Sequence, residues 1–339
     1  MKEERSVIVM GKEIAEARYY RKKREQQKLF DLLYVIFRGL LIIGISFIII
    51  YPIIQKIAVA FKDKVDIYNP TIYMVPVNFT WENLTMAMSI LDYFPMLGKT
   101  LVFVVVTTLC TVASCALAGY GFARFNFPGN GMFFGVVIIT ILVPTTTLML
   151  PYYLHFKNFD FLGIIGLLTG KPGVNLINTY WPSIITSATA IGLKAGLFIY
   201  IFRQFFKGLP KEIEEASFID GAGGIQTFFR IMLPNAIPPI ITVVLFCFVW
   251  QYNDTFYTTL FMSGMELMSL KVATLPSQAD QFIPVLMGYS HSSGFKADPN
   301  HVAMVVDTGI LLAILPLLAL YLVVQRYFVE SIERSGIVG

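Results

Sequence analysis

The residues with the clearest chemical pattern lie between positions 210 and 240, in a charged run too polar to cross a membrane. Three glutamates follow Pro210 at its start: Glu212, Glu214 and Glu215. Pro210 suits the first position of a helix, and carboxylates in the first turns favour the positive end of the helix dipole. Asp220-Gly221 would end this helix, because glycine adopts a positive φ without strain. A second short helix is expected over 225–232, so the run predicts a helix–turn–helix that lies across the membrane surface.

Polar and aromatic residues near the ends of the apolar runs form a second set. They could line a path between the spans by stacking and hydrogen bonding: Tyr153, Asn178, Tyr180, Trp250 and Asn253. Taken singly, each is more often a packing or interface residue. Lys194 lies within an apolar run, where a charge costs roughly 2.5–3.5 kcal/mol on insertion scales. It should face the bundle interior, a cavity or a partner subunit, and a purely structural ion pair or an extension toward the inner membrane surface is the simpler alternative.

These residues do not form a catalytic set, and the chain is therefore not expected to be an enzyme. A phosphate-binding loop needs Gly-x-x-x-x-Gly-Lys-Ser/Thr. At the nearest candidate, Gly170-Lys171, Ile165 replaces the first glycine and Pro172 replaces the hydroxyl residue. The histidines have no i, i+4 pairing and predict no metal site: His155, His291 and His301. The cysteines all lie in apolar runs and are expected to be small core residues: Cys110, Cys115 and Cys247.

Composition decides the fold class. Of 339 residues, 56% are hydrophobic and 14% charged, and the mean hydropathy is +0.66, whereas a soluble domain carries about 25% charged residues. Six apolar runs are each near the ~20 residues that cross the hydrocarbon core: 39–61, 101–122, 132–153, 181–202, 237–260 and 302–327. We therefore expect an all-α polytopic membrane protein with six transmembrane helices. Pro144 and Pro151 interrupt the third run, and such breaks survive only where protein or a water-filled cavity satisfies the backbone.

The distribution of charge sets the domain organisation and the orientation. Residues 1–38 are dense in Lys and Arg and are expected to form a cytoplasmic arm before the transmembrane domain, residues 39–339. Basic residues prefer the cytoplasmic side, which places both termini and the loop 203–236 in the cytoplasm. Three longer segments would then lie outside and could receive another protein: about 62–98, 155–178 and 261–301.

The charged loop also resembles a known motif. Glu215-Ala216-Ser217, Asp220-Gly221-Ala222 and Leu233-Pro234 are similar to the EAA loop of binding-protein-dependent ABC importer permeases, with Ser217 in place of the second alanine. Tyr120-Gly121-Phe122-Ala123-Arg124 resembles the short inner loop of carbohydrate permeases of this group. With further similarities over 39–339, the chain resembles the second permease subunit of maltose-type importers.

This resemblance implies a type I ABC importer fold, in which the loop is a coupling helix that docks in a groove of a cytoplasmic ATPase. Glu215 is then the expected charge contact with that groove. The other residues implied in coupling are Ala216, Ser217, Ile219, Asp220, Gly221, Leu233 and Pro234. The chain itself would bind no cofactor, since ATP and Mg²⁺ belong to the ATPase.

The same resemblance implies the partners and the cellular location. They are a second homologous permease, two ATPase subunits, an extracellular solute-binding protein and the lipid of a prokaryotic plasma membrane, with no nucleic acid. The solute is expected to be a carbohydrate, either an oligosaccharide or a sugar derivative. A permease for a non-sugar solute stays open as an alternative. A secondary transporter is also an alternative, although inverted repeats and paired midplane ionisable groups would then be expected.

Overall fold

The structure is a computed structural model that describes residues 2–336, apart from 70, 73, 171–172 and 290–295. Within helices, the side chains of residues 2–22, 25, 169 and 327–336 are not described. Over the described residues the chain is helical, and its only extended pairings are two isolated bridges, Lys62 with Phe79 and Phe159 with Val174. The predicted all-α class is confirmed.

Three helices are long and apolar enough to cross a membrane: α1 (Lys2–Ala60) through its part Gln26–Ala60, α4 (Tyr93–Arg124), and α16 (Pro299–Gly336) through Pro299–Arg326. They contain the predicted run 101–122 and nearly all of the runs 39–61 and 302–327. The predicted boundary at residue 38 is not a helix boundary, because α1 continues through it.

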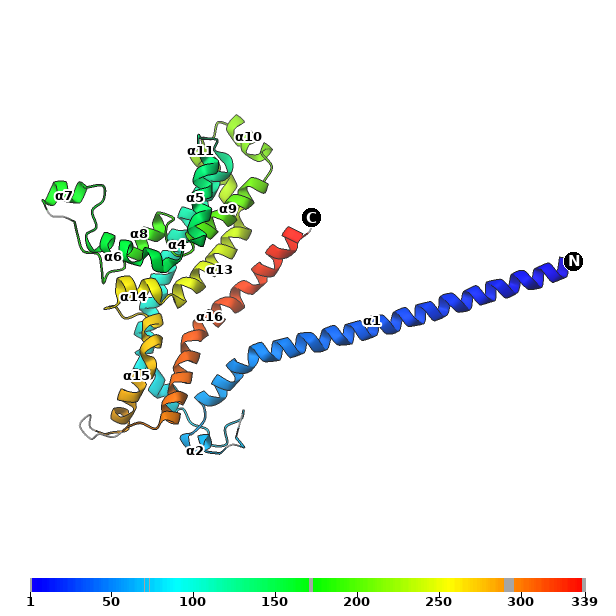
Figure 1. Cartoon of the computed structure of the whole chain (residues 1–339), viewed down its shortest axis with the longest axis horizontal. Coiled ribbons are helices and arrows are strands. Elements are labelled where there is room, and N and C mark those ends of the chain that lie inside the picture. The colour runs from blue at the N-terminus through cyan, green and yellow to red at the C-terminus, as the bar shows by residue number, and fades with distance from the viewer. Residues whose placement is uncertain (1, 70, 73, 171–172, 290–295, 337–339) are drawn as a thin grey trace.

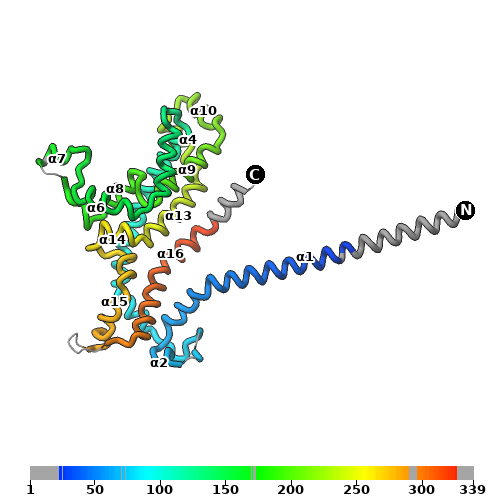
Figure 2. The backbone as a smooth tube through the Cα atoms, viewed as in Figure 1, coloured from blue at the N-terminus to red at the C-terminus, as the bar shows by residue number. Residues whose placement is uncertain are grey.

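Helix α1 stands apart from the rest of the molecule over most of its length (Figure 1). It meets α16 near its C-terminal end, where Lys56 Nζ lies 2.5 Å from Asp307 Oδ1. Helix α16 runs beside α13 (Ile237–Asn253), and the tube in Figure 2 traces both paths.

The predicted span 132–153 is bent. Helix α5 (Asn130–Leu142) is followed by the 3₁₀ turn η1 (Thr145–Leu148) and α6 (Met149–Lys157), with an angle of 103° at the break. Pro144 explains the bend, because its fixed φ and missing N–H stop the helix before it. Pro151 lies in the first turn of α6, where no intrahelical hydrogen bond is lost, so only one of the two prolines interrupts the run.

The predicted span 181–202 is wrong as a continuous helix. It is divided into α8 (Trp181–Ala188) and α9 (Ala195–Gly208), joined by residues 189–194. Ala190 and Lys194 adopt positive φ angles of 56° and 58° in this connection, hereafter the 189–194 break. Lys194 therefore lies at the N-cap of α9 and not within a helix.

The fifth predicted run, 237–260, is also shorter as a helix. It is α13 followed by the separate α14 (Phe256–Met262). The segment before α13 meets it at 79°. By length and composition the described helices supply three spans, or up to five if each bent pair is one span.

The predicted outer segments contain helices as well. These are α2 (Lys64–Ile67), α3 (Glu82–Leu91), α7 (Ile164–Thr169) and α15 (Met268–Leu286). Helix α15 packs against α3 and α16. Asp66 organises the turn after α2, since its carboxylate accepts hydrogen bonds from the N–H groups of Val77 and Asn78. Although burial acts to raise it, these bonds and the Asn78 side chain hold the pKa of Asp66 below its usual value.

Two hydrophobic clusters occupy the described bundle. One joins α3, α14, α15 and α16 to the first half of α4. The other, hereafter the inner cluster, joins the second half of α4 to α9 and α13 and includes Tyr120, Phe202, Phe206, Phe228 and Met232. Helices α4 and α9 meet closely at Gly119, where an added Cβ would lie 2.5 Å from Phe202 Cβ. The inner cluster is the base on which the charged loop rests.

Candidate coupling loop and solute cavity

The charged loop forms the expected helix–turn–helix, with α10 (Glu212–Ile219) as its first helix. Asp220 caps α10, and Gly221 turns the chain with φ 81° while its N–H donates to the carbonyl of Phe218. This confirms the predicted turn. Pro210 precedes the Lys211 cap of α10 and so lies outside the helix, not at its first position.

The second helical segment is longer than predicted. It comprises α11 (Gly224–Thr227), the π-helical turn η2 (Phe228–Met232) and α12 (Leu233–Asn235). Pro234 does not end it, because it lies in the first turn of α12, where its missing N–H is not needed.

A buried carboxylate fixes α10 to the bundle. Glu214 accepts a hydrogen bond from Tyr120 Oη at 2.6 Å and lies 3.4 Å from Arg124 Nε, with side chains only 10% and 5% exposed for Glu214 and Arg124. Arg124 also donates to the carbonyl of Leu209 at 2.7 Å, just before the loop begins. The last turn of α4 therefore holds both the start of the loop and its first helix.

Packing joins the two halves of the loop. Ser217 and Thr227 are buried and their hydroxyls lie 2.9 Å apart. The Phe228 ring lies 5.1 Å from Tyr120 and 6.3 Å from Phe206, centroid to centroid. Ser217, which was predicted to pack against a partner, is therefore part of the loop's interior and not of its surface.

The opposite face of the loop is exposed and largely apolar. Ile219 is 85% exposed, Ile225 78% and Phe218 46%. The other exposed residues of the predicted coupling set are Glu215, Ala216, Asp220, Gly221 and Pro234, while Leu233 is half-buried. Exposed apolar side chains gathered on one face of a firmly held loop mark an interaction site.

Sequence reasoning missed Glu214, Tyr120 and Arg124 as the residues that anchor this loop. A signal existed, because Tyr120 and Arg124 are four apart and share one face of α4, as Glu214 and Ser217, three apart, share one face of α10. The motif drew the prediction to Glu215 instead.

A cavity of about 540 Å³ opens at the 189–194 break, between α5, α9 and α13. Lys194 and Trp250 both line it, and the Lys194 Nζ lies 6.0 Å from the Trp250 ring centroid. Tyr152, Tyr257, Thr140 and Thr145 contribute hydroxyl groups to its wall. We call this space the solute cavity. It combines aromatic surface, hydroxyls and one cation.

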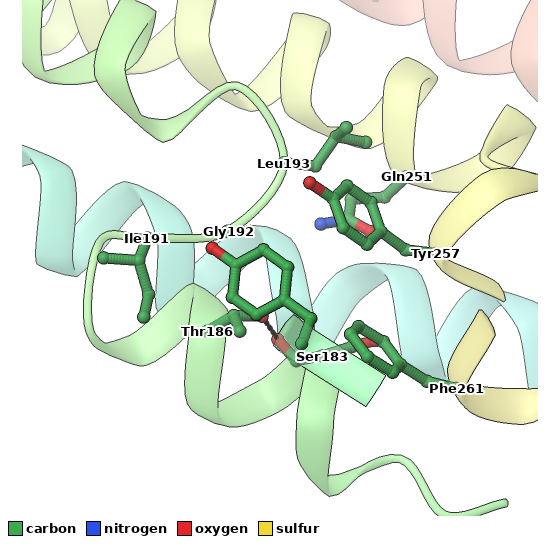
Figure 3. Close-up of a pocket in the computed structure, with 9 residues that line it drawn as sticks. Ser183, Thr186, Ile191, Gly192, Leu193, Gln251, Tyr257 and Phe261 are labelled. Atoms are coloured by element: carbon green, nitrogen blue, oxygen red, sulfur yellow. Dashed lines mark hydrogen bonds between the residues drawn. The ribbon is translucent and has the colours of Figure 1, made fainter. Parts of the chain in front are cut away.

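A smaller pocket of about 20 Å³ lies next to it, with room for roughly one water. Figure 3 shows the wall of this pocket, where Gln251 lies behind Tyr257 and the Thr186 hydroxyl donates to the carbonyl of Ser183 at 3.1 Å. Tyr152 and Tyr257 line both spaces.

Four of the six predicted path residues lie elsewhere. The Tyr153 ring centroid lies 5.8 Å from Lys157 Nζ, and the Tyr180 ring centroid lies 5.5 Å from that of Phe103. The Asn253 side chain donates to the carbonyl of Val249. Asn178 connects its own loop to the end of α14, since its Oδ1 accepts from the Gly264 N–H and its backbone N–H donates to the carbonyl of Phe261. Of the histidines, His155 packs between Phe156 and Phe159, His301 is buried, and His291 lies outside the described residues.

Comparison with known proteins assigns the chain to a family. The family model described as "Binding-protein-dependent transport system inner membrane component" matches residues 111–334, more than half of the chain, and this match includes the whole coupling loop. The chain belongs to this family. It is thus a permease component of an ABC transporter, a multi-pass membrane protein and a transport subunit.

Individual relatives agree with this assignment. The probable ABC transporter permease YurM of Bacillus subtilis is 26% identical over 298 residues, covering 86% of this chain and 84% of its own length. The arabinooligosaccharide transport permease AraQ of Halalkalibacterium halodurans is 24% identical, with 87% and 93% covered.

A solved structure shows the same fold. It is that of a bacterial ABC transporter involved in the import of the acidic polysaccharide alginate. A chain of this transporter matches with a TM-score of 0.68 and 18% identity, over 88% of this chain and 97% of its own. The type I importer fold expected from the sequence is confirmed.

Proposed function

We propose that this permease imports a carbohydrate that an extracellular binding protein delivers, and that its charged loop couples transport to a cytoplasmic ATPase. The observation that carries the proposal is the loop itself: an exposed apolar face flanked by Glu215 and Asp220, on a base fixed by the buried Glu214–Arg124 pair. The names of relatives such as the arabinooligosaccharide permease support a carbohydrate as the solute.

The assembly proposed is a second permease, two ATPase subunits that bind ATP with Mg²⁺, and the binding protein. Both termini and the loop lie in the cytoplasm in this arrangement. The loop, at α10, and the α2 segment lie at opposite ends of the helix bundle (Figure 1), which suits a loop that meets the ATPase and an outer segment that meets the binding protein. Basic residues near the loop, including Arg203, Lys207 and Arg230, favour the same orientation.

Closure of the ATPases on ATP would move the docked loop. Because α9 runs from the 189–194 break to the loop and α13 runs from the loop to Trp250, rigid-body movement of the loop reaches both walls of the solute cavity. Alternating access follows from this connection.

Charge reversal at Glu215 tests the coupling role. In proteoliposomes with the complete transporter, Glu215→Lys should lower solute uptake per ATP hydrolysed at least about tenfold, because an interfacial charge pair with the ATPase is lost. Membrane insertion and expression should not change, since Glu215 is exposed and makes no contact that the bundle needs.

The matched control is Asp280→Lys, a charge reversal at an exposed acid of α15. This helix lies at the end of the bundle away from α10 (Figure 1). It should leave the ratio of uptake to ATP hydrolysis within about twofold of the wild type. Normal uptake by Glu215→Lys at wild-type expression would reject the proposed role.

A further inference from the structure

The solute cavity contains one unbalanced charge. None of the residues that line it is acidic, and Lys194 is its only charged side chain. The ion pairs among the described residues are Lys56–Asp307, Lys99–Glu266 and Arg124–Glu214, and none of them includes Lys194. The Lys194 ammonium group lies 6.0 Å from the centroid of the Trp250 ring, at the distance of a cation–π contact.

The backbone adds to this positive field. Lys194 is the N-cap residue of α9, a helix of 14 residues, so the positive end of the helix dipole and the ammonium group lie at the same edge of the cavity. Transporters often place the N-terminus of a broken helix next to the anionic group of their solute. A left-handed φ at Lys194 is an uncommon conformation for a residue other than glycine and fixes this placement.

The rest of the wall suits a sugar ring. Trp250, Tyr152 and Tyr257 offer aromatic surface, and the tyrosine hydroxyls together with Thr140 and Thr145 offer donors and acceptors. A volume of about 540 Å³ falls in the range of small-molecule sites.

We infer that the solute cavity binds an anionic saccharide, whose carboxylate pairs with Lys194 while its ring packs against Trp250 and the two tyrosines. This inference rests on the proposed carbohydrate function and narrows its substrate class. It also explains a lysine at a helix break near an aromatic wall, since a carboxylate on the sugar would supply the counter-charge that none of the residues lining the cavity supplies.

The test measures direct binding to the purified transporter, with both permeases and both ATPases, in lipid nanodiscs. The probes are trigalacturonate and the neutral maltotriose. We expect the wild type to bind trigalacturonate at least tenfold more tightly than maltotriose, with an affinity that falls as NaCl is raised. Lys194→Met should remove this preference, because its affinity for trigalacturonate should fall tenfold while its affinity for maltotriose stays within twofold of the wild type. Lys194→Arg should keep the preference.

Lys157→Met is the control, because Lys157 lies over the Tyr153 ring outside the cavity. This variant should bind both probes with the affinity of the wild type. The inference is overturned if the wild type shows no saturable binding of trigalacturonate, or if Lys194→Met changes the affinities for both probes by the same factor. It is also overturned if Lys194→Met releases the second permease on size-exclusion chromatography, since Lys194 would then pair with that subunit.

Failure of the inference can be told apart from failure of the proposed function. If ATP hydrolysis is still stimulated by the binding protein while no anion preference is found, only the inference about Lys194 fails. If the chain does not assemble with an ATPase at all, the proposed function fails.

Discussion

Glu214 and Glu215 are adjacent in the sequence and meet opposite surroundings. Glu214 is buried against Tyr120 and Arg124, whereas Glu215 is exposed beside Ala216 and Ile219. Neighbouring positions on α10, about 100° apart around the helix axis, thus hold the residue that anchors the loop and the residue proposed to meet the ATPase. The functions of the two carboxylates should be separable by mutation.

Glu214→Gln should loosen the loop. It leaves the Arg124 guanidinium buried without a counter-charge, and breaking a buried pair costs about 3–5 kcal/mol. The measurement is hydrogen exchange over residues 210–235 in the detergent-solubilised chain, where protection should fall by at least about tenfold. Glu212→Gln, at an exposed acid of the same helix, should leave protection unchanged.

A double substitution distinguishes a true pair from two separate effects. The loss of protection in Glu214→Gln with Arg124→Gln should be clearly smaller than the sum of the two single losses, because each single change already breaks the pair. Additive losses would show that Glu214 and Arg124 do not act together.

At the scale of elements, the contact between α4 and α9 links the loop to the bundle. Gly119 permits it, since an added Cβ would lie 3.0 Å from Arg203 N and 3.1 Å from the Ile199 carbonyl, both fixed backbone atoms. Arg203 continues the contact by donating to the carbonyl of Phe122 and stacking 3.8 Å from the Phe134 ring centroid. The two helices should therefore move as one body.

Gly119→Ala should push α9 away from α4 and destabilise the chain by about 1–3 kcal/mol, the usual cost of overpacking. Thermal unfolding of the purified protein measures this as a lower Tm. Gly121→Ala is the matched control two residues along, because a Cβ there meets nothing within 4 Å. It should hold or slightly raise the Tm, and an equal loss in both variants would contradict the close contact.

The elements also show what hydropathy can and cannot predict. The runs 39–61, 101–122 and 302–327 were predicted because a long apolar stretch has one stable form in lipid, the continuous helix. Pro144 signalled the bend in the third run. The 189–194 break had no such signal beyond Lys194 and Gly192. Hydropathy reports the polarity of side chains, whereas this break arises from the positive φ angles of Ala190 and Lys194. For the site, the motif predicted the exposed loop face, while the buried anchor and the cavity depend on contacts between distant helices.

For the whole molecule, the loop, the inner cluster and the solute cavity form one connected path. The loop rests on α4 through Glu214 and Arg124, α4 packs on α9 at Gly119, and α9 begins at Lys194 in the cavity wall. A docked ATPase could therefore move a cavity wall by moving the loop. The path needs the loop to be in contact with the ATPase on the cytoplasmic side.

Site-specific photocross-linking tests that contact most directly. A benzoylphenylalanine in place of Ile219, 85% exposed on the loop, should cross-link to the ATPase subunit in membranes that contain the complete transporter. The same group at Val77, which is 71% exposed and bonds to Asp66 of α2 at the opposite end of the bundle (Figure 1), should give no ATPase adduct. A cross-link from Val77 to the ATPase, or none from Ile219, would contradict the account.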